Sequence, residues 1–382
     1  MVASETALEE EYLVDGERGT EVRNELPKPT GEFAVGRVRV EISDDARAEV
    51  LAPPSGGGPR KLVIWIWYPA AASTASQYSP YLPHGWEASD TVMGAPLGTT
   101  SLQSHSNDDA PPLLERGPFP LLLFSASGFS PLSYVGLIEE LASQGYVVAS
   151  ICHTHDAPIT VFEDGNAVPA NQMNLRRITA AVGDPAAGDM EETFSFRAET
   201  ALLKRDDMAS TANLLPGVDA PISEAIDMER IGAFGHSLGG NAALEWCRMD
   251  DRCRAAANLD GAIWTEVGTT GLAKPAVVIA AEHPEMLAPP EQLVAAGAFP
   301  SVEWCLQERS YLFDGWQRIL DSGKPGTMHT IEGARHANFS DVQFVPLPDD
   351  SPMKRVLGPI APEMMWRRSS QLLLDFFGNH LH

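Results

Sequence analysis

The chain has 382 residues, of which 44% are hydrophobic, so it can bury a large core in one domain or two. Its 52 acidic and 27 basic residues give a formal net charge of −25 at pH 7, which argues against nucleic acid and anionic membranes as partners. No run of about 18 apolar residues occurs, so we expect no membrane span.

The N-terminus is acidic and lacks the apolar segment of a secretory signal. We therefore expect a cytoplasmic protein from the sequence as given, or a secreted one if a signal has been removed. Residues 1–32 predict a polar, acidic extension. Residues 33–382 predict one domain, because strand and helix patterns continue to the C-terminus without an internal repeat.

The first half of this domain alternates short predicted strands with long stretches of little periodicity. Alternating apolar and polar residues at 35–42 predict an antiparallel strand, and the apolar run at 118–125 predicts a buried one. The irregular stretches 70–117 and 153–192 are typical of functional insertions in a compact domain. The other predicted elements here are a strand at 61–68, a helix at 133–143 and a strand at 146–151.

In the second half, helices and strands alternate more regularly. This alternation predicts the α/β class, with a mostly parallel central sheet and helices on both faces. Residues 283–325 predict a third insertion, irregular or helical. The predicted elements are helices at 194–215, 240–248 and 364–377, and strands at 230–234, 254–260, 276–280 and 327–331.

The segment Gly235-His-Ser-Leu-Gly239 has the G-x-S-x-G pattern of a nucleophile elbow. The pattern is short, but its context is the required one: an apolar predicted strand precedes it and a helix-forming segment follows. Ser237 would then sit on a tight strand-to-helix turn with its hydroxyl exposed. We therefore predict a serine hydrolase with an α/β-hydrolase fold, the sheet carrying cap or loop insertions.

A serine hydroxyl needs a base to accept its proton, and α/β-hydrolases place the base after the acid in chain order. His336 lies in a turn directly after the last predicted strand, where the base belongs. His329 falls inside that strand, which favours a structural role, and His283 precedes nearly every candidate acid. His380 and His382 belong to the C-terminal tail. We predict His336 as the base.

Two carboxylates downstream of Ser237 end predicted strands and are therefore candidates for the acid. Asp260 ends the strand that follows the elbow helix, and Glu282 ends the next one. Gly261 permits the tight turn that would swing the short carboxylate of Asp260 toward the base. The residues favour Asp260 and leave Glu282 as the alternative.

Two backbone N–H groups should stabilise the oxyanion, one after the nucleophile and one in the loop after an earlier central strand. Leu238 follows Ser237, and Phe129 lies in the loop after strand 118–125. We predict both as oxyanion donors. This mechanism needs neither a metal nor an organic cofactor.

The four cysteines form no C-x-x-C pair, and their spacing with histidines does not indicate zinc. Cys247 and Cys253 flank a predicted helix-to-strand turn and are near enough in sequence to bridge in an oxidising compartment. Two ordinary thiols remain the alternative.

Several of these segments together resemble the platelet-activating-factor acetylhydrolase family, in its plasma and type II branch. One departure is Ser127-Gly128, where the family has His-Gly. The resemblance covers roughly residues 28–380. The matching stretches are Phe124-Ser-Ala-Ser-Gly-Phe129, Leu141-Ala-Ser-Gln-Gly-Tyr-Val-Val-Ala149, Gly235-His-Ser-Leu-Gly-Gly240, Leu259-Asp260 and His336-Ala-Asn-Phe-Ser-Asp341.

Carried over residue by residue, the resemblance implies Ser237 as nucleophile, Asp260 as acid, His336 as base and Phe129 as an oxyanion donor. It also implies a lipase-like carboxylesterase that acts on a small-molecule ester with a short or medium acyl group. The same triad would serve a lactonase, a thioesterase, an acyltransferase or a polyester hydrolase. A binding protein built on a hydrolase scaffold is the non-catalytic alternative.

The three insertions would line the acyl and alcohol pockets. Four tryptophans fall in or beside them and are either substrate walls or core residues: Trp86, Trp264, Trp304 and Trp316. The sequence does not determine the oligomeric state.

Overall fold

The computed structural model describes residues 25–52, 57–71, 78–92, 95–126, 129–171, 189–219, 221–348 and 351–382. Among these residues, nine strands form the main sheet, in the order β13-β12-β11-β10-β6-β7-β2-β1-β5. The six neighbouring strands β13, β12, β11, β10, β6 and β7 run parallel to one another. Strands β1 and β2, toward the other end of the sheet, are antiparallel neighbours. The sheet strands are β1 (Ala34–Ala48), β2 (Pro59–Ala70), β5 (Ser106–Asp108), β6 (Phe119–Ser125), β7 (Val147–Cys152), β10 (Ile226–His236), β11 (Cys253–Leu259), β12 (Ala276–Ala280) and β13 (Gly326–Thr330).

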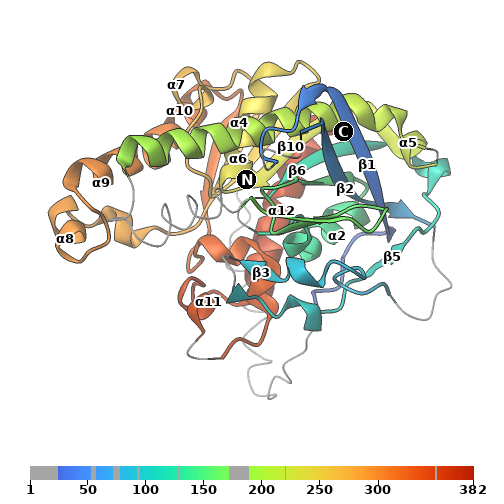
Figure 1. Ribbon diagram of the computed structural model, residues 1–382, viewed down its shortest axis with the longest axis horizontal. Coiled ribbons are helices and arrows are strands. Elements are labelled where there is room, and N and C mark those ends of the chain that lie inside the picture. Colours follow the sequence, from blue (N-terminus) through green and yellow to red (C-terminus); the bar gives the residue numbers. More distant parts are fainter. Residues whose placement is uncertain are drawn as a thin grey trace, which may run out of the picture.

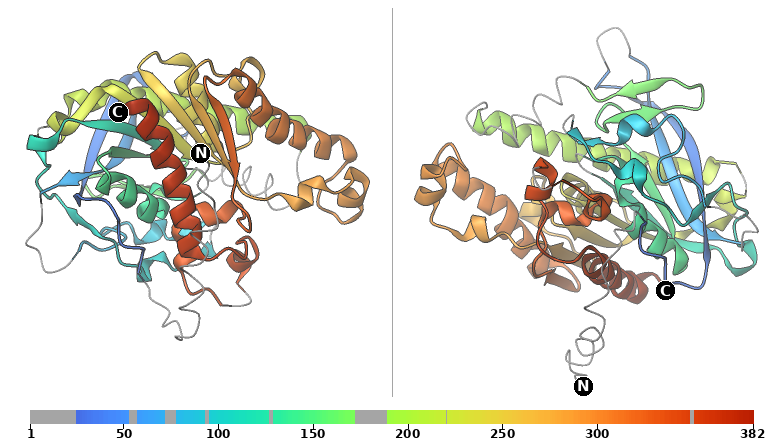
Figure 2. Two further views of the ribbon diagram at one scale, coloured as in Figure 1. Left: turned by 180° about the vertical axis from the view of Figure 1, so that it is seen from behind. Right: turned by 90° about the horizontal axis from the view of Figure 1, so that it is seen from below.

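Helices cover both faces of this sheet (Figures 1 and 2). Helices α2 and α12 lie on one face, and α4, α6 and α10 lie on the other. The α-helices of the described residues are α2 (Val135–Ser143), α4 (Met190–Leu214), α5 (Ile222–Ala225), α6 (Leu238–Met249), α7 (Val267–Thr270), α8 (Pro290–Ala295), α9 (Val302–Arg309), α10 (Gly315–Ser322), α11 (Pro352–Arg355) and α12 (Pro362–Leu381).

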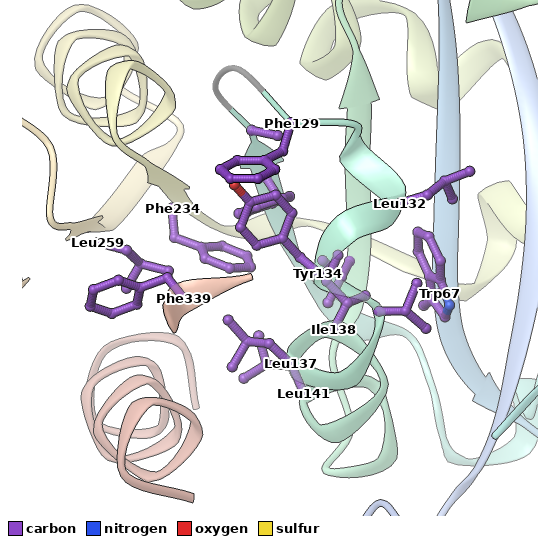
Figure 3. Close-up of a cluster of buried hydrophobic side chains, with 14 of the residues drawn as sticks. Trp67, Phe129, Leu132, Tyr134, Leu137, Ile138, Leu141, Phe234, Leu259 and Phe339 are labelled. Atoms are coloured by element: carbon purple, nitrogen blue, oxygen red, sulfur yellow. The ribbon is translucent and has the colours of Figure 1, made fainter. Parts of the chain in front are cut away.

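The central strands are buried on both faces, and their side chains alternate between two hydrophobic cores. In β6, Leu122 and Phe124 point to the core under α2 and α12, whereas Leu121 and Leu123 point to the core under α4 and α6. Figure 3 shows part of the first core, where the ring of Tyr134 lies next to that of Phe129. Continuous apolar runs are therefore typical of these strands, as the sequence indicated.

The predicted α/β-hydrolase architecture is confirmed, and element bounds shift by a few residues. Strand β10 starts at Ile226, four residues before its predicted start, because its first residues pair with β6 ahead of a register shift. Of the predicted extension, residues 1–24 lie outside the described residues. No helix in the described part of the chain is long and apolar enough to cross a membrane.

The described residues of the three predicted insertions form short elements. Those of 70–117 contain strand β5 of the main sheet, the small strands β3 and β4 and three short 3₁₀ helices, and those after β7 contain a small hairpin. Residues 283–325 are mainly helical, and α8 and α9 project from the body of the protein beyond the end of α4 (Figure 1). The small strands are β3 (Thr91–Val92), β4 (Ala95–Pro96), β8 (Ile159–Val161) and β9 (Ala167–Pro169).

Candidate active site

Ser237 occupies the strained backbone position of a nucleophile elbow. Strand β10 ends at His236 and α6 begins at Leu238, so Ser237 alone makes the turn, with φ 59° and ψ −127°. A Cβ at Gly235 would lie 2.3 Å from the carbonyl oxygen of Gly239, and one at Gly239 would lie 2.0 Å from that of Ser125. Both positions therefore require glycine, as the motif predicted.

The turn at the end of β11 packs directly against this elbow. The Ser237 N–H donates to the carbonyl of Leu259 at 2.9 Å. Asp260 follows with a positive φ of 53°, and a Cβ at Gly261 would lie 2.2 Å from the Ser237 carbonyl oxygen. The close approach therefore requires glycine after Asp260 and places the carboxylate beside the nucleophile's turn.

Asp260 is 2% exposed, and its carboxylate accepts three hydrogen bonds. Oδ2 accepts from Nδ1 of His336 at 2.6 Å, and Oδ1 accepts from Nε2 of His283 and the backbone N–H of Ala281, both at 2.8 Å. Burial by itself would raise the pKa of Asp260, but the hydrogen bonds from His283 and His336 outweigh it and hold that pKa well below its ordinary range. The acid is therefore ionised at neutral pH.

His336 is the exposed member of this pair, with 45% of its side chain accessible. Because Nδ1 faces Asp260, Nε2 is the ring nitrogen that can accept a proton. Glu282, the alternative acid, instead accepts a hydrogen bond from the backbone N–H of Gly333 at 2.9 Å and so braces the turn that carries His336. His329 lies in edge strand β13.

The sequence did not predict the position of His283. Its sequence position made it a candidate for the base only, whereas in the structure its ring bonds the second carboxylate oxygen of Asp260. Burial disfavours its charged form, but the hydrogen bond to Asp260 and the charge of that carboxylate raise the pKa of His283. The available signal was its position just past β12, the strand beside β11.

His236, the second residue of the motif, is a buried ring next to that of His336. Its ring centroid lies 4.4 Å from that of His336, and its Nδ1 lies 2.8 Å from the hydroxyl of Tyr134. Burial and the nearby charge of His336 lower the pKa of His236 well below its ordinary value. His236 is therefore a neutral ring that packs against His336.

The two predicted oxyanion donors come from different parts of the chain. Leu238 is the first residue of α6, and Phe129 packs in the core against His236 and Tyr134, with ring centroids 6.4 Å apart in both pairs. Residues 127–128, which belong to the same predicted loop, lie outside the described residues.

Of the four tryptophans in or beside the insertions, some are core residues and others lie near the nucleophile elbow. Trp86 and Trp316 are almost fully buried, and the indole N–H of Trp316 donates to the Gly261 carbonyl at 2.8 Å. Trp264 is half-buried, and its backbone N–H donates to Asn241 in the first turns of α6 at 2.8 Å. Trp264 belongs to an aromatic cluster beside the elbow that also contains Phe194, Trp304 and Tyr311.

Cys247 and Cys253 are joined by a disulfide between α6 and β11, with Cα atoms 5.0 Å apart, which answers the question that the spacing left open. Cys152 and Cys305 are buried free thiols. Within the described ranges, no group of three or more His, Cys, Asp or Glu side chains is arranged to hold a metal ion.

Comparison with known proteins adds a family and a fold relative. The family model described as platelet-activating factor acetylhydrolase, isoform II, matches residues 19–382. A probable 1-alkyl-2-acetylglycerophosphocholine esterase of Arthroderma benhamiae is 24% identical over 264 residues, which are 65% of this chain and 61% of the relative. A platelet-activating factor acetylhydrolase of Cavia porcellus is 26% identical over 159 residues, which are 39% of this chain and 36% of the relative.

The match therefore spans less than two thirds of either relative's length. Among solved structures, a ferulic acid esterase from Streptomyces cinnamoneus superposes with a TM-score of 0.70 and 25% identity, over 94% of this chain and 93% of that one.

Proposed function

This chain belongs to the platelet-activating factor acetylhydrolase isoform II family, and from this premise we propose that it hydrolyses carboxylic esters through an acyl-enzyme on Ser237. The observation that carries the proposal is the pairing of His336 with buried Asp260 directly beside the strained turn of Ser237. A surface serine in an ordinary turn needs neither the strain nor the buried charge.

In the proposed mechanism, Nε2 of His336 accepts the hydroxyl proton as Ser237 Oγ attacks the ester carbonyl carbon. The tetrahedral intermediate collapses when His336 returns that proton to the leaving alcohol. A water molecule then attacks the acyl carbon of the acyl-serine as Nε2 of His336 accepts its proton. The second tetrahedral intermediate collapses when His336 returns that proton to Ser237 Oγ, which releases the carboxylic acid product and restores the serine hydroxyl. Asp260 keeps Nδ1 of His336 protonated and stabilises the imidazolium that forms twice in the cycle.

The negative oxygen of each tetrahedral intermediate needs fixed donors. We assign this role to the backbone N–H groups of Leu238 and Phe129. Loss of one such donor in other enzymes costs about 10²–10³ in kcat.

For the substrate, we propose an ester with a short or medium acyl group. The names of both curated relatives refer to acetyl esters, and the net charge of −25 favours neutral or cationic alcohol groups over polyanionic ones. An aromatic ester is the second candidate, because the solved relative is a ferulic acid esterase and half-buried Trp264 lies next to the elbow.

Three sets of measurements test this function. Turnover of p-nitrophenyl acetate should exceed that of the palmitate, and faster palmitate hydrolysis would contradict the short-acyl proposal. A panel containing an acetylated phosphocholine lipid, methyl ferulate, a lactone and a thioester, run with and without an amine acceptor, separates the two ester classes from lactonase, thioesterase and transfer activity. A fluorophosphonate should label the wild type and not Ser237→Ala; an unlabelled wild type would favour the binding-protein alternative.

A further inference from the structure

Helix α4 presents two buried charged side chains to the end of strand β6, the strand that leads into the predicted oxyanion loop. Lys204 is 2% exposed and Asp207 is fully buried, one turn apart on the same face of the helix. Fully buried charges of this kind are rare unless they are paired and bonded. Lys204 bonds the segment that passes the nucleophile elbow directly, and Asp207 reaches the same segment through His153.

The ammonium group of Lys204 holds the first peptide after β6. Its Nζ donates to the backbone carbonyl of Ala126 at 3.0 Å and forms an ion pair with Asp156. This bond fixes the backbone carbonyl of the first residue after the end of β6.

A second connection runs from Asp207 to the side chain of Ser125. Asp207 bonds Nδ1 of His153 at 2.9 Å, and Nε2 of His153 lies 2.8 Å from the hydroxyl of Ser125. This is the bonding order of a catalytic triad, but Ser125 is 0% exposed and His153 is 2% exposed, so no substrate reaches them. Arg60, also fully buried, pairs with Asp207 at 2.6 Å and compensates its charge.

The segment held in this way lies directly against the elbow. A Cβ at Gly239 would lie 2.0 Å from the Ser125 carbonyl oxygen and 3.1 Å from that of Ala126. The two bonded residues therefore contact both α4, directly or through His153, and the first turn of α6. Three residues later the chain reaches Phe129, the proposed oxyanion donor.

We propose that Lys204 and, through His153, Asp207 are positioning residues that hold Ser125 and Ala126, the backbone that leads to the proposed donor Phe129, against the turn of Ser237. This inference rests on the proposed hydrolytic function. Neither side chain touches the substrate; both act on the backbone that carries the donor. Their removal should therefore impair stabilisation of the transition state more than binding of the ester.

The principal test replaces the buried ion pair by neutral residues, Lys204→Met with Asp156→Asn, so that no lone charge stays buried. The matched control is Lys274→Met, a half-buried lysine that also donates to backbone carbonyls, those of Cys247 and Asp250, but at the far end of α6. A second variant, Ser125→Ala, removes the hydroxyl that bonds His153 and so breaks the connection to Asp207, while every charged side chain stays in place. Urea unfolding verifies that each variant is folded.

In the double variant, kcat for p-nitrophenyl acetate should fall about 10–100-fold, with KM changed by less than about 3-fold. The inhibition constant of phenylboronic acid, whose adduct with Ser237 places a hydroxyl at the oxyanion position, should rise by the same factor as kcat falls. Ser125→Ala should lower kcat by about 10-fold, and Lys274→Met should leave it unchanged.

A double variant whose kcat matches that of Lys274→Met, or whose loss lies in KM alone, would overturn the positioning role. Wild-type kcat in Ser125→Ala would overturn the connection through His153. Ser237→Ala separates this from the parent proposal: if that variant retains wild-type activity, hydrolysis does not proceed through Ser237 and the proposed acyl-enzyme mechanism is wrong. If it is inactive, the result for Lys204 decides the inference alone.

Discussion

Nδ1 of His336 lies 2.6 Å from Oδ2 of Asp260, across 76 residues of sequence. The bond connects the turn after β13 to the turn after β11, both at the carboxyl edge of the parallel sheet. Because Asp260 is buried and ionised, it gives His336 one orientation and one tautomer, which is what a base for Ser237 needs.

Removal of the proposed nucleophile should abolish catalysis without unfolding the protein. We expect Ser237→Ala to lower kcat by about 10⁴–10⁶-fold, and Asp260→Asn, which gives His336 the wrong tautomer, by about 10³–10⁴-fold. Steady-state hydrolysis of p-nitrophenyl acetate measures both. Ser43→Ala, on the exposed part of β1, is the control and should retain full activity; an Asp260→Asn enzyme as active as that control would rule out Asp260 as the acid.

His283 should shape the pH dependence of the reaction. Burial opposes its charge, but Asp260 raises the pKa of His283 above its ordinary value, so its ring is protonated more readily than that of an ordinary histidine and its positive charge offsets the negative charge of Asp260. Glu285, 3.7 Å away, and Arg335 face the same ring. In His283→Gln the uncompensated carboxylate favours the imidazolium of His336, so the acidic limb of kcat/KM should move up by about 0.5–1 pH unit.

The control for this shift is His329→Gln, an exposed histidine on edge strand β13, which should leave the profile in place. An unchanged acidic limb in His283→Gln would show that His283 serves only to orient Asp260.

His153 should make the protein sensitive to mild acid. Burial and the charge of Lys204 lower the pKa of His153 to about 4, so between the unfolded value near 6.5 and 4 the unfolded state binds more protons than the folded one. The free energy of unfolding therefore decreases as pH falls through that window, by up to ~3 kcal/mol. Asp341, whose pKa burial raises to about 7, contributes with the opposite sign.

Comparison of variants isolates the His153 contribution, because that of Asp341 is common to all of them. Urea denaturation at pH 7.5 and pH 5 should show a smaller loss of stability on acidification in His153→Gln than in the wild type. His84→Gln, at a fully exposed position, should follow the wild type. Equal pH dependence in all three proteins would contradict the prediction.

The disulfide should stabilise the fold without taking part in catalysis. It closes a short loop, with a sequence separation of 6, so chain entropy gives it about 2 kcal/mol. We expect the Cys247→Ala, Cys253→Ala double variant to unfold at lower urea and to keep its kcat. Two thiols, those of Cys152 and Cys305, should titrate in denaturant before reduction, and four after it; four before reduction would show that the bridge does not form.

The sequence alone was sufficient to predict the fold class and to propose Ser237, Asp260 and His336 as the triad. Each of these residues follows a recognisable strand, and parallel strands bring their carboxyl ends to one edge whatever the details of packing. The glycines of the elbow could be interpreted because the motif marks where the chain reverses, although the group that excludes a Cβ at Gly239 is the Ser125 carbonyl of strand β6.

Only the tertiary structure decided which side chains meet across the sheet. His283 joins Asp260 rather than replacing His336, Glu282 braces a turn, and Lys204 of α4 reaches Ala126 after β6. The first two pairings join segments that follow neighbouring strands, whose conformations the strand pattern does not give. The third depends on how far α4 slides and rotates on the sheet, and hydrophobic periodicity fixes the buried face of a helix but not its register against a particular strand.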